Sequence, residues 1–185
     1  MTPQASAPGS RPRPAEAPLS EEAPDAQALL RMSVGSDILA VPIQDVREII
    51  QISRMTPLPR TPAFVRGVMN LRGAVVPVID LAARLGGPAT RIGRRSCIVV
   101  VASPDNADGD GERGMVVGLQ VDAVHEVFAR RADEVEGVPN LGTSIDPHFL
   151  AGMTRAAGQV IGILSLATVV EVESLTAAIA GQAPH

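Results

Sequence analysis

Few side chains in this sequence have the types and spacing that would support catalysis. The chain contains no lysine, so a phosphate-binding glycine loop with a lysine is excluded, and it contains no G-x-S-x-G motif. His125 has no cysteine or second histidine near it, which argues against a metal site and a catalytic base. Cys97 is the only cysteine and lies in an apolar stretch, which predicts a small buried side chain in a reducing compartment. We therefore expect no enzymatic activity, no catalytic residues, no metal and no cofactor.

One loop offers partial support for a ligand. Asn106, Asp108, Asp110 and Gly111 fit the first half of an EF-hand calcium loop, but Val117 stands where the bidentate glutamate should be. A variable surface loop over 103–114 is the favoured interpretation. A ligand-binding barrel that takes calcium or a metabolite remains the alternative from a different functional class.

Arg72 is the other side chain that could act, by binding rather than by catalysis. It lies between two apolar segments, residues 67–71 and 74–79, which predict a pair of strands. Gly73 can take the positive φ that a tight hairpin turn demands. Arg72 is then either a solvated turn residue or a fixed guanidinium that is paired with a carboxylate and offered to a partner.

The residues after the predicted hairpin indicate how it continues. Pro77 cannot donate to a strand ladder, so we expect an edge, a bulge or a bend there. Asp80 is suited to cap a short helix over Leu81–Leu85, and Gly86 is suited to end it.

The remaining pattern predicts an all-β protein with many short strands and a few small helices. Further strands are expected over Ala28–Val34, Ile38–Pro42, Ser96–Ala102, Met115–Val121 continuing to Phe128, Phe149–Met153 and Val160–Leu164. Helical segments are expected over Ile43–Ile50 and Leu166–Ala180, with loops over 51–62 and 130–139.

Composition limits the partners. The Pro- and Ala-rich residues 1–26 are expected to form a disordered tail. A net charge of −4, with no Trp or Tyr, argues against nucleic acid, and no apolar run reaches the length of a membrane span. Arg91, Arg94 and Arg95 form a small basic cluster, interpreted as a solvated strand entry with a docking role as the alternative.

Three motifs of the first half resemble the CheW adaptors of bacterial chemotaxis. Asn70-Leu71-Arg72-Gly73, followed by apolar residues, Ile79-Asp80-Leu81 and Arg84-Leu85-Gly86, resembles the central motif of that family. Val41–Ile50 resembles its V-x-x-V-x-E-I segment, and Pro57–Gly67 resembles its P-x-x-P-x-x-(F/I)-x-G segment. The resemblance runs from about Ala28 to Val170.

The second half resembles the family more by pattern than by residue. Val121–Val127 is similar to its V-D-x-V-x-E-V segment. A loose internal repeat relates Phe64–Gly67, followed by Asp80-Leu81, to Phe149–Gly152, followed by Ser165-Leu166, and suggests two half-domains. Ser165 stands where the family usually has aspartate, although a serine can also cap a helix.

The resemblance implies two small five-stranded SH3-like barrels packed side by side within residues 27–172, with a helix end and tail over 173–185. It implies a non-catalytic adaptor in the cytoplasm, at membrane-associated receptor arrays and without membrane insertion of its own. Its partners would be a chemoreceptor's cytoplasmic tip, held in an apolar seam between the barrels, and the regulatory domain of a CheA-type histidine kinase. An adaptor of a non-flagellar chemosensory pathway is the alternative.

The resemblance also implies which residues bind. The expected receptor- or kinase-binding residues are Val46, Glu48, Gly67, Arg72 and Gly73. Glu48 is expected to pair with Arg72, and Asn70 is expected to be a structural turn residue.

Overall fold

The computed structural model describes residues 25–102, 115–138 and 144–171 of the 185-residue chain. The first half forms β1 (Ala26–Val34), β2 (Asp37–Pro42), the 3₁₀ helix η1 (Ile43–Asp45), β3 (Val46–Gln51), β4 (Val65–Leu71), β5 (Ala74–Asp80) and α1 (Leu81–Arg84). The second half forms β6 (Cys97–Ala102), β7 (Val116–Val121), β8 (Ala123–Arg131), the 3₁₀ helices η2 (Ala132–Glu134) and η3 (Pro147–Phe149), β9 (Leu150–Ala156), β10 (Gln159–Leu164) and α2 (Leu166–Val169).

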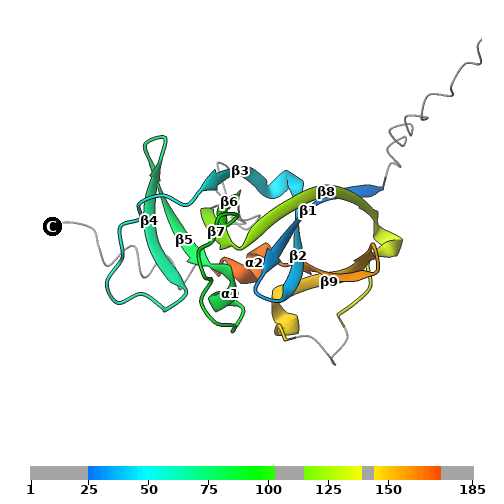
Figure 1. The fold of residues 1–185 in the computed structure, drawn as a ribbon. Helices are drawn as coiled ribbons and strands as arrows, with labels where there is room; N and C mark the ends of the chain where they lie inside the picture. Colours follow the sequence, from blue (N-terminus) through cyan, green and yellow to red (C-terminus); the bar gives the residue numbers. More distant parts are fainter. Residues whose placement is uncertain (1–24, 103–114, 139–143, 172–185) are drawn as a thin grey trace, which may run out of the picture.

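The strands build two five-stranded sheets, ordered β8-β1-β2-β10-β9 and β3-β6-β7-β5-β4. Figure 1 shows the two sheets as separate curved bodies side by side, with α1 and α2 between them. A single bridge brings the open edges of each sheet together, Thr56 to Val68 in one and Glu136 to Met153 in the other. We call the sheet that contains β1 barrel 1 and the sheet that contains β4 barrel 2. The predicted all-β fold with two five-stranded barrels is confirmed.

The two barrels exchange strands. The first half of the chain contributes β1 and β2 to barrel 1 and β3 to β5 to barrel 2, whereas the second half contributes β6 and β7 to barrel 2 and β8 to β10 to barrel 1. Neither barrel is therefore continuous in sequence. The largest apolar cluster contains buried residues of both barrels, and each barrel adds a smaller cluster of its own.

The internal repeat noted in the sequence is repeated in the contacts. The N–H of Asp80 donates to the Phe64 carbonyl at 2.7 Å, and the N–H of Ser165 donates to the Phe149 carbonyl at 2.9 Å. The parallel pair β5–β7 likewise matches the parallel pair β10–β2. The two halves of the chain thus repeat the same contacts, although neither half forms a barrel by itself.

The helix predicted over Ile43–Ile50 is wrong. Only η1 is helical, and β3 begins at Val46. The apolar spacing misled because Ile49 is an apolar residue on the exposed face, 45% exposed, whereas Val46, Glu48 and Ile50 are half-buried in the alternation of a strand. Pairing with β6 decides the conformation of this segment.

Pro77 does not lie on an edge strand, because β5 runs between β7 and β4. In the pairing with β4, Pro77 lies opposite Val68, close to a bulge at Arg66. The pairing with β7 begins only at the next residue, Val78. Proline has no backbone N–H to donate, and a central strand tolerates it here because Pro77 lies just outside the β5–β7 pairing. The predicted cap is confirmed, since the Asp80 carboxylate accepts from the Ala83 N–H at 3.3 Å.

Two strand boundaries and one helix cap also differ from the sequence expectation. Asp122 separates β7 from β8, and the two strands belong to different barrels. β8 continues to Arg131, so the expected loop over 130–139 is shorter. Ser165 does not cap α2 with its side chain, which contacts the Thr168 hydroxyl at 3.0 Å instead. The part of the predicted helix beyond 171 lies outside the described residues.

Cys97 is half-buried and not in a disulfide, at the start of β6. Burial raises the pKa of its thiol, which disfavours the reactive thiolate. This agrees with the expected packing role.

Arg84 joins the two repeats at the point where α1 meets α2. Its guanidinium donates to the Val169 and Thr168 carbonyls, each at 3.0 Å, and lies 4.9 Å from the ring centroids of both Phe64 and Phe149. These carbonyls lie in the last turn of α2 and have no partner within the helix, so Arg84 satisfies them.

Arg84→Met should lower the free energy of unfolding by about 2–4 kcal/mol, because it removes charge-assisted hydrogen bonds and two cation–π contacts. Chemical denaturation followed by far-UV circular dichroism measures this. Arg155→Met is the matched control, since that exposed side chain has no ion pair among the described residues. Equal stability of the two variants would contradict the role of Arg84.

Gln120 in β7 is fully buried, and neither its amide nitrogen nor its amide oxygen has a hydrogen-bond partner within the part of the chain that the structure describes. Gln120→Met keeps the shape of the side chain and removes the buried amide. We expect it to raise the free energy of unfolding by about 1–3 kcal/mol, measured as a higher Tm. An unchanged or lower Tm would mean that a buried water satisfies the amide.

Candidate docking site

The β4–β5 hairpin presents Arg72 at an exposed turn. Arg72 has φ 52° and Gly73 has φ 87°, so both turn residues are left-handed, as a two-residue hairpin turn requires. The Asn70 side chain accepts from the Gly73 N–H at 2.9 Å and stabilises the turn. The structural role expected for Asn70 is confirmed.

Arg72 and Glu48 form an ion pair. The Arg72 guanidinium donates to the Glu48 carboxylate at 3.1 Å, with the arginine side chain 80% exposed and the glutamate side chain 24% exposed. The bulge at Arg47 lies directly before Glu48 and sets the direction of its side chain. An exposed pair of this kind adds less than about 1 kcal/mol to stability. Its charges therefore remain available to a partner.

A depression of about 380 Å³ lies beside this pair. It is lined by Arg47, Glu48, Leu71, Arg72, Val100 and Val116. Charged side chains thus surround an apolar floor, which is the usual arrangement of a small protein-binding site.

The other expected binding residues occupy different environments. Val46 is half-buried and packs on the shared core. Gly67 is buried with φ 135°, where a Cβ would overlap the carbonyl of Thr56. Gly73 is exposed beside Arg72. The structure thus brings Glu48, Arg72 and Gly73 to one surface, whereas Val46 packs on the shared core and Gly67 lies against Thr56, away from that turn.

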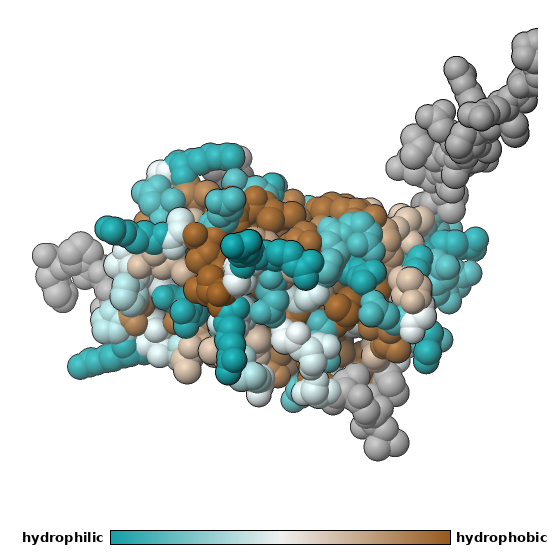
Figure 2. All heavy atoms as spheres, in the orientation of Figure 1, coloured by the Kyte–Doolittle hydropathy of each residue, from teal (hydrophilic) through white to brown (hydrophobic). Residues whose placement is uncertain are grey.

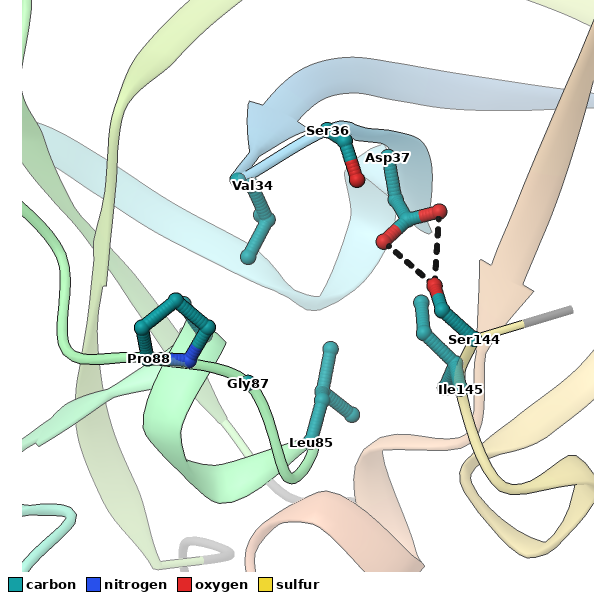
Figure 3. Close-up of a pocket in the computed structure, with 10 residues that line it drawn as sticks. Val34, Ser36, Asp37, Leu85, Gly87, Pro88, Ser144 and Ile145 are labelled. Atoms are coloured by element: carbon teal, nitrogen blue, oxygen red, sulfur yellow. Dashed lines mark hydrogen bonds between the residues drawn. The ribbon is translucent and has the colours of Figure 1, made fainter.

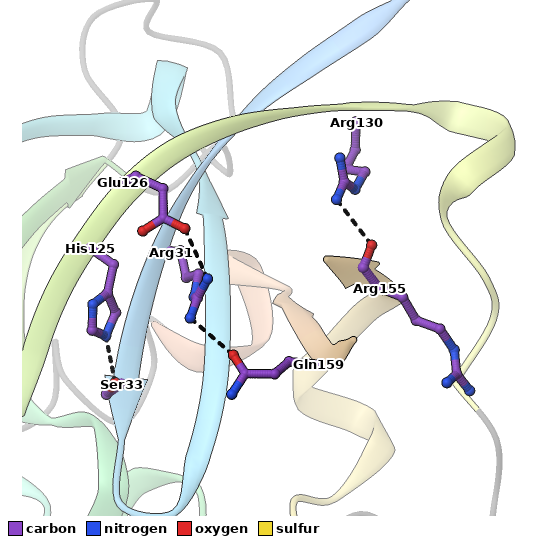
Figure 4. A network of polar contacts seen from close by, with 7 residues as sticks. All are labelled: Arg31, Ser33, His125, Glu126, Arg130, Arg155 and Gln159. Carbon is purple, nitrogen blue, oxygen red and sulfur yellow. Dashed lines mark hydrogen bonds and ion pairs between the residues drawn. The ribbon is translucent and has the colours of Figure 1, made fainter. Parts of the chain in front are cut away.

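Barrel 1 carries a related cluster at the equivalent position. A bulge in β8 sets His125 and Glu126 opposite Arg31, as the bulge in β3 sets Glu48. Arg31 donates to Glu126 at 2.8 Å and to the Gln159 side chain at 2.9 Å (Figure 4). A backbone hydrogen bond and the charge of Arg31 lower the pKa of Glu126.

Exposed apolar side chains occur in matching pairs on the two barrels. Ile49 in β3 and Val127 in β8 are 45% and 49% exposed, and each follows the bulged glutamate directly. Val75 and Val160, each the second residue of its hairpin strand, are 66% and 44% exposed. Figure 2 shows apolar surface over β3 and β8 on this face. Each barrel therefore presents a glutamate flanked by exposed apolar residues.

A separate pocket of about 340 Å³ lies between the barrels (Figure 3). It is lined by Val34, Gly35, Ser36, Asp37, Ala82, Leu85, Gly87, Pro88, Ser144 and Ile145. Among these lining residues, the Ser144 hydroxyl lies 3.0 and 3.2 Å from the two carboxylate oxygens of Asp37. The pocket is mainly apolar in its lining, and its use as a receptor-binding seam stays a prediction.

The residues that the structure describes offer no group of three metal-binding side chains, and no helix among them is long and apolar enough to cross a membrane. The loop with partial calcium-binding character, 103–114, lies outside them.

Comparison with known proteins decides the family. The CheW-like domain model matches residues 28–174. The chain belongs to the CheW-like domain family. The chemotaxis protein CheW of Rhizobium meliloti (strain 1021) is 34% identical over 150 residues, covering 81% of this chain and 91% of that protein. Protein FrzA of Myxococcus xanthus is 32% identical over 140 residues, covering 76% and 81%.

A solved structure supports the same assignment. The crystal structure of the scaffolding protein TtCheW from Thermoanaerobacter tengcongensis matches with a TM-score of 0.68 and 32% identity, covering 80% of this chain and 94% of that chain. The resemblance stated from the sequence motifs is thereby confirmed.

Sequence reasoning missed the contacts of Arg84 and Arg31 and the paired exposed apolar residues. Arg31 had a signal, because a lone charge inside an apolar strand needs acceptors nearby. The apolar pairs had none, since their exposure depends on which strands form the edges of each barrel.

Proposed function

We propose that this chain is a non-catalytic adaptor that couples a chemoreceptor to a CheA-type histidine kinase in a bacterial chemosensory array. Membership of the CheW-like family and the scaffolding protein of similar structure support an adaptor. The observation that carries the proposal is Arg72, held at an exposed hairpin turn by its pair with Glu48, where it contributes little to stability. The chain would work in the cytoplasm, at membrane-associated receptor arrays.

Two kinds of surface support a bridging role. The apolar pocket between the barrels would accept apolar side chains of a receptor helix, in a helix-in-groove contact. The glutamate and exposed apolar residues at each barrel would pack against a related barrel of the kinase. Two separate contacts on one chain allow a tight assembly to form from weak pairwise contacts.

The experiment is a pairwise binding measurement. Labelled protein is titrated with the isolated regulatory domain of a CheA-type kinase and, separately, with receptor-containing membranes from the same genome. Arg72→Ala should weaken at least one of the two interactions, while Arg155→Ala, which removes an exposed arginine of barrel 1, should weaken neither. Binding to neither partner, by the wild type as well, would contradict the proposal.

A further inference from the structure

The charges of this chain are divided unevenly between the barrels. Residues 46–102, which include all of barrel 2 except β7, contain nine arginines and two carboxylates, for a net charge of +7. Since the whole chain carries −4, all other residues together carry −11. Of the two carboxylates, Glu48 pairs with Arg72, and Asp80 is fully buried.

Several of these arginines belong to segments at the end of β5 that lies opposite to the Arg72 hairpin turn. The Asp80 carboxylate accepts from the N–H and the hydroxyl of Thr90, both at 2.8 Å, and its N–H donates to Phe64, so these three residues lie together. Arg66 follows Phe64 by two residues, and Arg91 follows Thr90 directly, so both arginines belong to the segments that meet at Asp80.

The segment after Arg91 leads directly into β6 and carries two further arginines. Arg66, Arg91, Arg94 and Arg95 are all exposed, and none forms an ion pair among the described residues. Ile92 lies among them and is 57% exposed. We call these five residues the arginine surface. In Figure 2, long hydrophilic side chains project from the half of the molecule that holds β4 and β5.

We propose that the arginine surface binds an acidic protein segment that carries an apolar residue. Guanidinium groups pair with carboxylates in a bidentate manner, and arginine is enriched at the hot spots of protein–protein interfaces. The exposed Ile92 would contact the apolar residue of the partner. The inference does not rest on the proposed function, because this surface is separate from the Glu48–Arg72 pair.

Other polyanions fit less well. Nucleic acid fits less well because the chain has no Trp or Tyr to stack on bases. One exposed isoleucine is too small an anchor for a lipid surface. A second copy of this chain is the competing acidic partner, because the residues outside 46–102 carry −11, and self-association at low salt distinguishes it from a separate acidic segment.

The test uses the full chain and a fluorescent peptide of repeated Glu-Glu-Leu-Glu units, followed by fluorescence anisotropy at low salt. We expect saturable binding that Arg91→Glu, Arg94→Glu and Arg95→Glu each weaken by about three- to tenfold and that added salt weakens further. Arg155→Glu, which reverses one exposed charge on barrel 1, should change affinity by less than about twofold, since screening limits its reach.

Three results would overturn the proposal. The first is equal weakening by Arg155→Glu and Arg94→Glu, which would mean unspecific attraction. The second is tighter binding to a single-stranded oligonucleotide or to phosphatidylserine vesicles than to the peptide. The third is self-association of the protein at low salt, abolished by Arg94→Glu, without peptide binding.

Discussion

Gly67→Ala should lower the free energy of unfolding by about 3–5 kcal/mol, the largest stability effect that we expect from a single added methyl group. Gly67 has φ 135°, which a residue with a Cβ rarely adopts, and an added Cβ would lie 2.8 Å from the carbonyl carbon of Thr56. Thr56 exchanges two hydrogen bonds with Val68, at 2.8 and 2.9 Å, and these close barrel 2. The added methyl group would push Thr56 away from Val68 and break these two hydrogen bonds.

Two glycine variants make the Gly67 result interpretable. At Gly137 an added Cβ would meet open space and φ is not positive, so Gly137→Ala should leave the free energy of unfolding nearly unchanged. Gly73→Ala has open space but φ 87°, so it should cost only the backbone strain, about 1–2 kcal/mol. Urea denaturation of the three variants separates strain from overlap. If Gly67→Ala cost no more than Gly73→Ala, the close approach of Thr56 would not matter for stability.

Arg72→Glu should weaken partner binding at least tenfold, because like charges that meet across an interface cost several kcal/mol. The same change should alter the free energy of unfolding by less than about 1 kcal/mol, since an exposed ion pair contributes little. The measurement is binding to kinase regulatory domain and to receptor membranes, paired with a thermal melt of each variant.

The charge-swapped variant Glu48→Arg with Arg72→Glu distinguishes a direct role from a supporting one. The swap restores an ion pair at the hairpin but reverses both charges that a partner meets. We expect stability near wild type and binding as weak as in Arg72→Glu. Recovery of binding in the swapped protein would show that the pair acts only by holding the hairpin in place.

The sequence was informative wherever local chemistry fixes structure. Asp80 caps α1, Gly73 and Asn70 make the turn, and most strands follow from β-branched apolar runs. The contact between Glu48 and Arg72 could be expected from the family motif. Their role in binding stays a prediction.

The rest depends on pairing between distant strands. The helix expected over Ile43–Ile50 gave way to β3 because β6 supplies its partner strand. Pro77 could not be placed in a central strand without the order β7-β5-β4. The exchange of strands between barrels, and with it the shared core, has no local signal at all.

The most direct test of the adaptor role is the amount of CheA-type kinase that sediments with receptor-containing membranes as this protein is added. The proposal predicts that kinase sediments weakly alone, that wild-type protein raises the amount severalfold, and that Arg72→Glu does not. Detection needs a label, because the chain has no Trp or Tyr. Kinase that sediments equally with and without the protein would contradict the claim that this chain couples the two partners.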